Sequence, residues 1–131
     1  LMSAITEQDP DFHPEVVYMH ASAYGTEHTA GEVTMYSSVE PREVAGRTVI
    51  VLDDCLDRGV TYGKIKQLLL SCNASSVSLT VLVNKDVRRE GVESPALIGF
   101  TTPDVWLTGI GMDDADTAPE ARRWAGYIAE V

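Results

Sequence analysis

The chain has 131 residues, of which 44% are hydrophobic and 23% are charged, and this is the length and composition of one ordinary globular domain. Ten basic residues stand against 20 acidic ones, so the net charge is −10. This balance argues against a protein that holds nucleic acid or an anionic membrane through a basic face. It does not argue against a phosphate site built from backbone N–H groups.

Targeting and redox signals indicate a cytoplasmic protein. No apolar run approaches the roughly 20 residues that a membrane span needs, and no basic region precedes a long apolar one as in a signal peptide. Cys55 and Cys72 lie in apolar segments without metal-type spacing. We therefore expect two reduced thiols rather than a disulfide.

The N-terminal part of the chain predicts few regular elements. Residues 1–5 resemble the end of a helix, so we expect the numbering to begin inside a longer protein. Residues 8–14 contain two prolines and predict a connection. A loose apolar alternation over residues 15–21 predicts a strand, and a short strand at 33–36 follows a polar, glycine-bounded loop at 24–32.

The clearest pattern lies in the middle of the chain. Residues 48–52 form a continuous β-branched apolar run, typical of a strand buried on both faces of a parallel sheet. Residues 77–83 form a second such strand. Between them, apolar side chains recur at the spacing of one helix face, at Ile65, Leu68, Leu69 and Cys72. Strand, helix and strand make a right-handed βαβ unit, which predicts an α/β fold with a largely parallel sheet.

The C-terminal third predicts shorter elements. Two short strands, at 96–100 and 105–108, flank a turn around Pro103. The tail is ambiguous, and fits a short helix over 119–124 followed by a closing strand over 127–131.

Carboxylates follow the first strand of the βαβ unit, at Asp53, Asp54 and Asp57. Ligands of parallel sheets bind at this edge. Gly59 permits close backbone approach, and the N–H groups at the start of the next helix form an anion site. Thr61 offers a hydroxyl donor or a helix cap. The segment therefore predicts a phosphate cradle beside carboxylates that suit Mg²⁺ or sugar hydroxyls. The alternative is an ordinary solvated loop.

The 13 residues VIVLDDCLDRGVT, from Val49 to Thr61, resemble the signature of the type I phosphoribosyltransferases. The resemblance implies that Asp53 and Asp54 contact the ribose hydroxyls of 5-phosphoribosyl-1-pyrophosphate. It also implies that a loop wraps the 5′-phosphate, and its residues are Asp57, Arg58, Gly59, Val60 and Thr61. Arg58 stands where the family has Thr or Ser. It either replaces that hydroxyl with charge-assisted hydrogen bonds or points to solvent.

The remaining motifs resemble the branch of this family that acts on 6-oxopurines, the hypoxanthine-guanine phosphoribosyltransferases. Residues 82–85 (LVNK) resemble the branch's strand ending in lysine, which implies that Lys85 donates to the purine O6. An ammonium selects a carbonyl and rejects the amino group of adenine. Residues 99–107 (GFTTPDVWL) imply that Trp106 stacks on the purine and that Leu107 reads its edge through backbone groups. Without the family resemblance, Lys85 would be interpreted as a solvated charge at a strand end and Trp106 as a core residue.

Weaker matches cover the rest of the expected site. Asp113 resembles the acidic residue that meets Mg²⁺ on the pyrophosphate side, and Arg123 aligns better than Arg122 with the cation for pyrophosphate. Ser22 and Tyr24 resemble the start of a mobile loop whose lid would be residues 25–32, although the family has Ser-Tyr without the intervening alanine. The family's upstream Lys-Gly loop for pyrophosphate has no counterpart near the N-terminus. We therefore expect residues 1–131 to be a single domain that lacks the N-terminal part of the full fold.

The resemblance implies a complete functional account. The fold would be α/β, with a largely parallel central sheet and a small hood formed by the C-terminal segment. The chain would transfer the phosphoribosyl group to hypoxanthine or guanine with Mg²⁺ as cofactor, and Asp57 would be the general base. The protein would be a dimer or tetramer without nucleic-acid or membrane partners. The alternatives are a regulatory nucleotide-binding protein that binds RNA, a degenerate domain without turnover, and an enzyme for another base such as xanthine.

Overall fold

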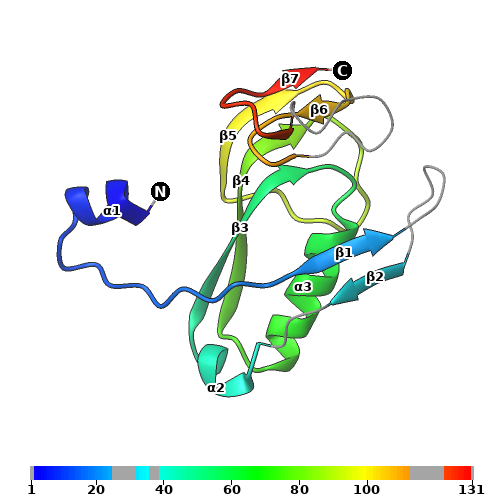
Figure 1. The fold of residues 1–131 in the computed structure, drawn as a ribbon. Coiled ribbons are helices and arrows are strands. Elements are labelled where there is room, and N and C mark those ends of the chain that lie inside the picture. Colours follow the sequence, from blue (N-terminus) through cyan, green and yellow to red (C-terminus); the bar gives the residue numbers. More distant parts are fainter. Residues whose placement is uncertain (1, 25–31, 36–38, 113–122, 131) are drawn as a thin grey trace.

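A computed structural model of the chain describes residues 2–24, 32–35, 39–112 and 123–130 (Figure 1). The helices are α1 (Met2–Gln8), α2 (Pro41–Val44) and α3 (Val60–Ser71). The strands are β1 (Ala21–Tyr24), β2 (Glu32–Met35), β3 (Thr48–Leu56), β4 (Ser76–Lys85), β5 (Leu97–Thr102), β6 (Leu107–Thr108) and β7 (Ala129–Glu130). None of the helices in these ranges has the length and apolarity to cross a membrane.

The centre of the fold is a parallel sheet of three strands in the order β3-β4-β5. Helix α3 joins β3 to β4 and packs against one face of this sheet (Figure 1). The predicted helix face is confirmed, since Ile65 and Leu69 are buried and Leu68 packs against them. Every second residue of β4 is buried on the same face, namely Val77, Leu79, Val81, Val83 and Lys85. The sequence prediction of an α/β fold with a parallel sheet is therefore confirmed.

The second face of the sheet is open over the described residues. Ile50 is 57% exposed and Leu52 is 53% exposed. Leu97 and Leu82 are also exposed. They lie beside Leu52, since Leu52 and Leu97 both pair with Thr80 and Leu82 is two residues further along β4. The prediction that residues 48–52 are buried on both faces is thus wrong for this structure, because α3 covers only one face.

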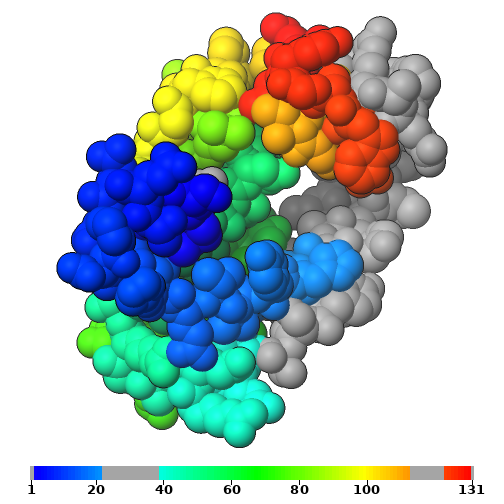
Figure 2. Space-filling view, turned by 60° about the vertical axis from the view of Figure 1, so that its left-hand side comes forward, coloured from blue at the N-terminus to red at the C-terminus, as the bar shows by residue number. Residues whose placement is uncertain are grey.

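The N-terminal segment runs along the outside of the molecule. Helix α1 contains no buried residue, and Figure 2 shows it, with the chain that follows it, on the outer surface. The predicted strand at 15–21 is wrong, since residues 13–20 form no strand and β1 begins only at Ala21. Val16, Val17 and Tyr18 are exposed, and only Met19 and Ala21 of this segment pack against the core. Strand β2 includes 33–35 of the strand predicted at 33–36, and residue 36 lies outside the described part. Strands β1 and β2 form an antiparallel pair beside α3 (Figure 1).

The C-terminal segment forms a small hood above the carboxyl ends of the central strands (Figure 1). Strands β6 and β7 pair antiparallel, with Leu107 opposite Glu130. They are shorter than the predicted strands at 105–108 and 127–131, and 119–122 of the predicted tail helix lie outside the described residues. Gly109 is required here, because its φ is +103° and a Cβ atom would lie 1.9 Å from the carbonyl oxygen of Tyr127. The predicted hood is confirmed.

Candidate active site

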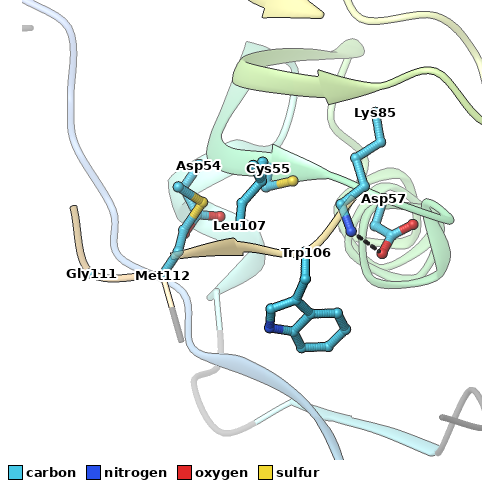
Figure 3. Close-up of a pocket in the computed structure, with 8 residues that line it drawn as sticks. All are labelled: Asp54, Cys55, Asp57, Lys85, Trp106, Leu107, Gly111 and Met112. Carbon is cyan, nitrogen blue, oxygen red and sulfur yellow. Dashed lines mark hydrogen bonds and ion pairs between the residues drawn. The ribbon is translucent and has the colours of Figure 1, made fainter. Parts of the chain in front are cut away.

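An open pocket of about 360 Å³ lies where the carboxyl ends of the parallel strands meet the hood (Figure 3), within the usual size range of small-molecule sites. Strand β3 and the loop after it contribute three residues, β4 contributes its last residue, and the hood contributes four. The lining residues are Asp54, Cys55, Asp57, Lys85, Trp106, Leu107, Gly111 and Met112. The sequence motifs predicted five of them, Asp54, Asp57, Lys85, Trp106 and Leu107.

The acidic pair lies within β3 rather than in the loop after it. The apolar run ends at Leu52, but pairing with β4 continues from Asp53 opposite Val81 to Leu56 opposite Asn84. The sequence prediction of this boundary is wrong because the ten-residue β4 keeps supplying partners beyond the apolar run. Burial, followed by the charge of Asp54, raises the pKa of Asp53 from 3.8 to about 6. Asp53 therefore binds its proton more tightly than an ordinary exposed carboxylate does.

The loop after β3 leads directly into α3, as predicted. Gly59 is the N-cap residue, with φ +79°, and a Cβ atom there would lie 2.8 Å from a methyl group of Val92. Both observations explain why glycine occupies this position. Thr61 is the second residue of α3 and not its cap, because Gly59 holds that position. The first N–H groups of a helix have no partner within it, so residues 60–62 offer donors to an anion.

Lys85, Asp57 and Trp106 converge in the pocket (Figure 3). The Lys85 Nζ atom lies 3.0 Å from Oδ2 of Asp57 and 5.5 Å from the centroid of the Trp106 ring. Lys85 is buried, with only 6% of its surface exposed, so it is not a solvated charge. Trp106 is 44% exposed at the pocket and is not a core residue. Three separate stretches of chain thus place a cation, a carboxylate and an aromatic face together.

One acceptor in this cluster is not used by its neighbours. Oδ1 of Asp57 is buried and accepts no hydrogen bond from the described residues. The Nε atom of Arg58 lies 3.5 Å from it, at ion-pair distance. A buried acceptor without a hydrogen bond is unfavourable, so this atom is suited to accept a hydrogen bond from a ligand.

Arg58 forms an ion pair with a residue of the loop that carries Trp106. Its Nη2 atom lies 2.7 Å from Oδ2 of Asp104, in the turn before Trp106. The side chain remains 59% exposed. Arg58 therefore connects the loop at 57–61 with the loop that carries Trp106.

The structure describes the side chains of some of the other predicted site residues but not of all of them. Arg123 donates from Nε to the carbonyl oxygen of Gly111, at 3.3 Å, and so lies beside the pocket. Leu107 is buried in β6. Ser22 and Tyr24 belong to β1, whose side chains beyond Ala21 lie outside the described part. Asp113 and residues 25–31 of the predicted lid also lie outside it.

The sequence reasoning missed Cys55, Gly111, Met112 and Arg89. Cys55 lies between two predicted site residues, and burial raises the pKa of its thiol, which disfavours the reactive thiolate. Met112 packs with Leu107 against Val83. Arg89 donates to the backbone carbonyl of Asp57. Arg89 lies four residues after Lys85 and outside any apolar repeat, so hydrophobic periodicity does not identify it.

Comparisons with known proteins agree with this architecture. The chain is 31% identical over 118 residues to the hypoxanthine phosphoribosyltransferases of Haemophilus influenzae and Escherichia coli. The match covers 89% of this chain and 63% and 64% of those relatives, so the chain spans less than two thirds of their length. A crystal structure of a hypoxanthine phosphoribosyltransferase from Staphylococcus aureus superposes with a TM-score of 0.78 at 25% identity, covering 99% of this chain and 68% of that one.

The family assignment follows from the fold and from a match along most of the chain. Residues 13–115 match the phosphoribosyl transferase domain family. This range contains the central sheet, α3 and all of the pocket-lining residues. The chain therefore belongs to the phosphoribosyl transferase domain family.

Proposed function

We propose that this chain carries the site at which a phosphoribosyl group is transferred from 5-phosphoribosyl-1-pyrophosphate to a 6-oxopurine, hypoxanthine or guanine. The observation that carries the proposal is the convergence of Lys85, Asp57 and Trp106, with Nζ of Lys85 3.0 Å from Asp57 and 5.5 Å from the indole centroid. The names of the similar proteins from Haemophilus influenzae and Escherichia coli support the same choice of base.

The hydrogen-bonding groups of the pocket complement one edge of a 6-oxopurine. That edge presents the O6 acceptor beside the N7–H donor. An ammonium only donates and a carboxylate only accepts, so Lys85 would bind O6 while Asp57 binds N7–H. Adenine presents an amino group at C6 and would face Lys85 with a second donor. The exposed face of Trp106 provides a stacking surface for the ring.

The reaction needs one proton to be removed. The purine N9 forms a bond to C1′ of the sugar while the bond from C1′ to the pyrophosphate oxygen breaks. The N7 proton passes to a carboxylate oxygen of Asp57, which acts as the general base. Positioning of the purine by Lys85 and Trp106 supplies the orientation that this displacement requires.

The sugar phosphate would bind along β3 and at the start of α3. The N–H groups at the N-terminus of α3, with Gly59, Val60 and the hydroxyl of Thr61, provide donors for the 5′-phosphate. Asp53 and Asp54 provide acceptors for the ribose hydroxyls, and Asp54 lines the pocket. Arg58 pairs with Asp104 and is 59% exposed, so we propose that its guanidinium turns to the 5′-phosphate when the sugar phosphate binds.

The described residues fit a magnesium ion that is held mainly by substrate. They contain no group of three or more His, Cys, Asp or Glu side chains able to hold a metal. Asp53 and Asp54 offer two adjacent carboxylates, and Mg²⁺ is commonly bound by one or two carboxylates together with substrate oxygens. When bound, the ion would neutralise the charge of the departing pyrophosphate. We propose Asp113 as a further ligand and Arg123 as the cation for pyrophosphate.

The remaining parts of the proposal concern the whole protein. Ser22 and Tyr24 would begin the loop that closes over the site. The enzyme would work in the cytoplasm as a homo-oligomer without nucleic-acid partners. Size-exclusion chromatography with light scattering measures the oligomeric state directly, and a mass of one chain at micromolar concentration would contradict this part.

A test of turnover separates this proposal from its main alternative, a nucleotide-binding domain without catalysis. The purified chain would be assayed by absorbance with 5-phosphoribosyl-1-pyrophosphate, Mg²⁺ and each of hypoxanthine, guanine, xanthine and adenine. We expect turnover with a 6-oxopurine, and a loss of about 10²–10⁴-fold in kcat in Asp57→Asn. Asp86→Asn is the matched control, because Asp86 is an exposed carboxylate directly after β4.

The outcomes of this assay are distinct. Turnover with adenine alone would contradict the assigned base. Nucleotide binding without turnover of any base would favour the non-catalytic alternative. Equal activity of the Asp57 and Asp86 variants would contradict the role of Asp57 as general base.

A further inference from the structure

Arg89 joins the carboxyl ends of the two strands that carry the pocket. Its guanidinium donates to three backbone carbonyl oxygens in the part-buried region behind the pocket. Nη2 lies 2.7 Å from the carbonyl oxygen of Leu56 and 2.6 Å from that of Lys85, and Nε donates to the carbonyl of Asp57. One side chain therefore holds the backbone of both members of the Lys85–Asp57 pair.

The sheet itself does not fix this spacing. The last residues paired between β3 and β4 are Leu56 and Asn84. Asp57 lies one residue beyond this ladder, and Lys85 is paired only on its other side, with Thr102 of β5. The relative position of Asp57 and Lys85 thus depends on contacts beyond the strand pairing, and Arg89 supplies hydrogen bonds to both.

We propose that Arg89 is a positioning residue for the 6-oxopurine contact, an inference that rests on the proposed function. It would act through Asp57 and Lys85 by setting the distance between the carboxylate and the ammonium that meet the two adjacent atoms of the purine edge. Arginine suits this task because its planar guanidinium carries five donors in a fixed geometry. The ammonium of a lysine is a compact point donor and would not span the same three carbonyls.

The phosphate cradle has its own support, so the two effects are separable. Gly59 begins α3, and the amide of Gly63 donates to the carbonyl oxygen of Gly59 at 2.9 Å. This first helical turn does not involve Arg89. Loss of Arg89 is therefore expected to affect the contact at C6 of the purine far more than the binding of the ribose 5-phosphate.

The test compares Arg89→Gln with Arg88→Gln in the full chain. Arg88 is the matched control, because its side chain is 89% exposed and forms an ion pair with the similarly exposed Glu90 at 3.4 Å. The parent chain and each variant also carry Trp124→Phe. Trp106 is then the one tryptophan that remains of the two in the sequence, so its fluorescence reports binding at the pocket. Inosine monophosphate and adenosine monophosphate are titrated separately, since they share the ribose 5-phosphate and differ at C6.

We expect Arg89→Gln to weaken inosine monophosphate by about tenfold and adenosine monophosphate by less than about twofold, since displacement of a group from its binding geometry removes most of its contribution. Arg88→Gln should leave both affinities unchanged. Arg89→Lys keeps the charge and should show the same selective loss, and it provides the comparison if Arg89→Gln does not fold. Equal weakening of both nucleotides, or no difference from the Arg88 variant, would overturn the proposal.

A second measurement keeps this proposal separate from the proposed function. Hydrogen exchange needs no ligand and is followed at the amides of Asp86 and Val87, which donate to the carbonyl oxygens of Thr102 and Lys85. Arg89 also binds the Lys85 carbonyl, so we expect exchange at these amides to be at least about tenfold faster in Arg89→Gln than in Arg88→Gln, because local opening governs exchange. If the parent chain binds inosine monophosphate without turnover, the proposed function fails while the affinities still test Arg89. If the parent binds neither nucleotide, the proposed function fails, and unchanged exchange would overturn the role of Arg89 as well.

Discussion

At the scale of single residues, Lys85 is the side chain whose placement most constrains the chemistry. It is buried and its ammonium is held by Asp57 at 3.0 Å and lies 5.5 Å from the centroid of the Trp106 ring. A buried ammonium is stable only when it is paired. A ligand that takes Lys85 from Asp57 must therefore offer an acceptor, as the O6 atom of a 6-oxopurine does.

Replacement of Lys85 by methionine tests this reading of the pocket. Methionine keeps an unbranched apolar side chain but removes the donor. Hydrogen bonds to charged groups contribute about 1.5–3 kcal/mol, so we expect inosine monophosphate to bind about 10–100-fold more weakly while adenosine monophosphate changes little. Lys66→Met is the control, since Lys66 pairs with Glu93 and does not line the pocket. An unchanged ratio of the two affinities would contradict the assignment of Lys85 to the purine.

Asp53 gives a prediction for the pH dependence of stability. Its pKa in the folded protein is raised to about 6 by burial and by Asp54, against 3.8 for the unfolded reference. The folded state therefore binds more protons than the unfolded state between these values, and its stability falls as pH rises through this window. In urea unfolding, we expect the free energy of unfolding to fall more from pH 5 to pH 7 in the parent chain than in Asp53→Asn. The same change in both proteins would show that Asp53 does not titrate in this range.

At the scale of elements, the two loops that surround the pocket are linked by Arg58 and Asp104, at 2.7 Å. Both side chains are about half exposed, so the pair is screened by water and salt. The link is thus a weak connection between the loop that begins α3 and the turn before Trp106. We expect this pair to open at little cost when an anion binds at the helix terminus.

A double-mutant cycle measures this connection. We expect Arg58→Thr, Asp104→Asn and the double variant to give a coupling free energy of about 0.2–1 kcal/mol in urea unfolding, as for other exposed pairs. The coupling free energy should decrease in about 0.5 M salt, because salt at this concentration strongly screens the attraction between exposed charges. A coupling well above this range, or one that salt does not change, would show that the pair is shielded from solvent.

The elements also show what the sequence could and could not predict. Hydrophobic periods identified β3, α3 and β4, because these elements bury one face against each other. The end of β3 was not predictable from polarity, since Asp53 and Asp54 remain paired with or beside β4. Within residues 15–20 only Met19 packs against the core, so the local alternation was misleading there. The partner of Arg58 lies 46 residues away along the chain and has no local signal.

At the scale of the whole molecule, the core lies on one face of the central sheet. Leu79 of β4 is 1% exposed on the face that α3 covers, whereas Leu52 on the neighbouring strand is 53% exposed. The apolar run in the sequence indicates burial of both faces, but periodicity does not say which covering element is present in this chain. Five of the predicted site residues nevertheless line one pocket, because the carboxyl ends of parallel strands gather at one edge whatever covers the faces.

Alanine substitutions at these two leucines test the location of the core. Leu79→Ala should lower the free energy of unfolding by about 2–5 kcal/mol, because it removes buried methyl groups and leaves a cavity. Leu52→Ala should lower it by less than about 1 kcal/mol, since most of its side chain is already in water. Urea unfolding monitored by circular dichroism measures both values. Similar losses at the two positions would show that the second face is covered in solution.

The most direct test of the central claim is a crystal structure of this chain with inosine monophosphate. We predict that Nζ of Lys85 lies within hydrogen-bonding distance, about 2.7–3.2 Å, of the purine O6. The purine ring should stack on Trp106, and the 5′-phosphate should lie at the N-terminus of α3. A nucleotide bound elsewhere, or bound with O6 away from Lys85, would contradict the assignment of this pocket to a 6-oxopurine.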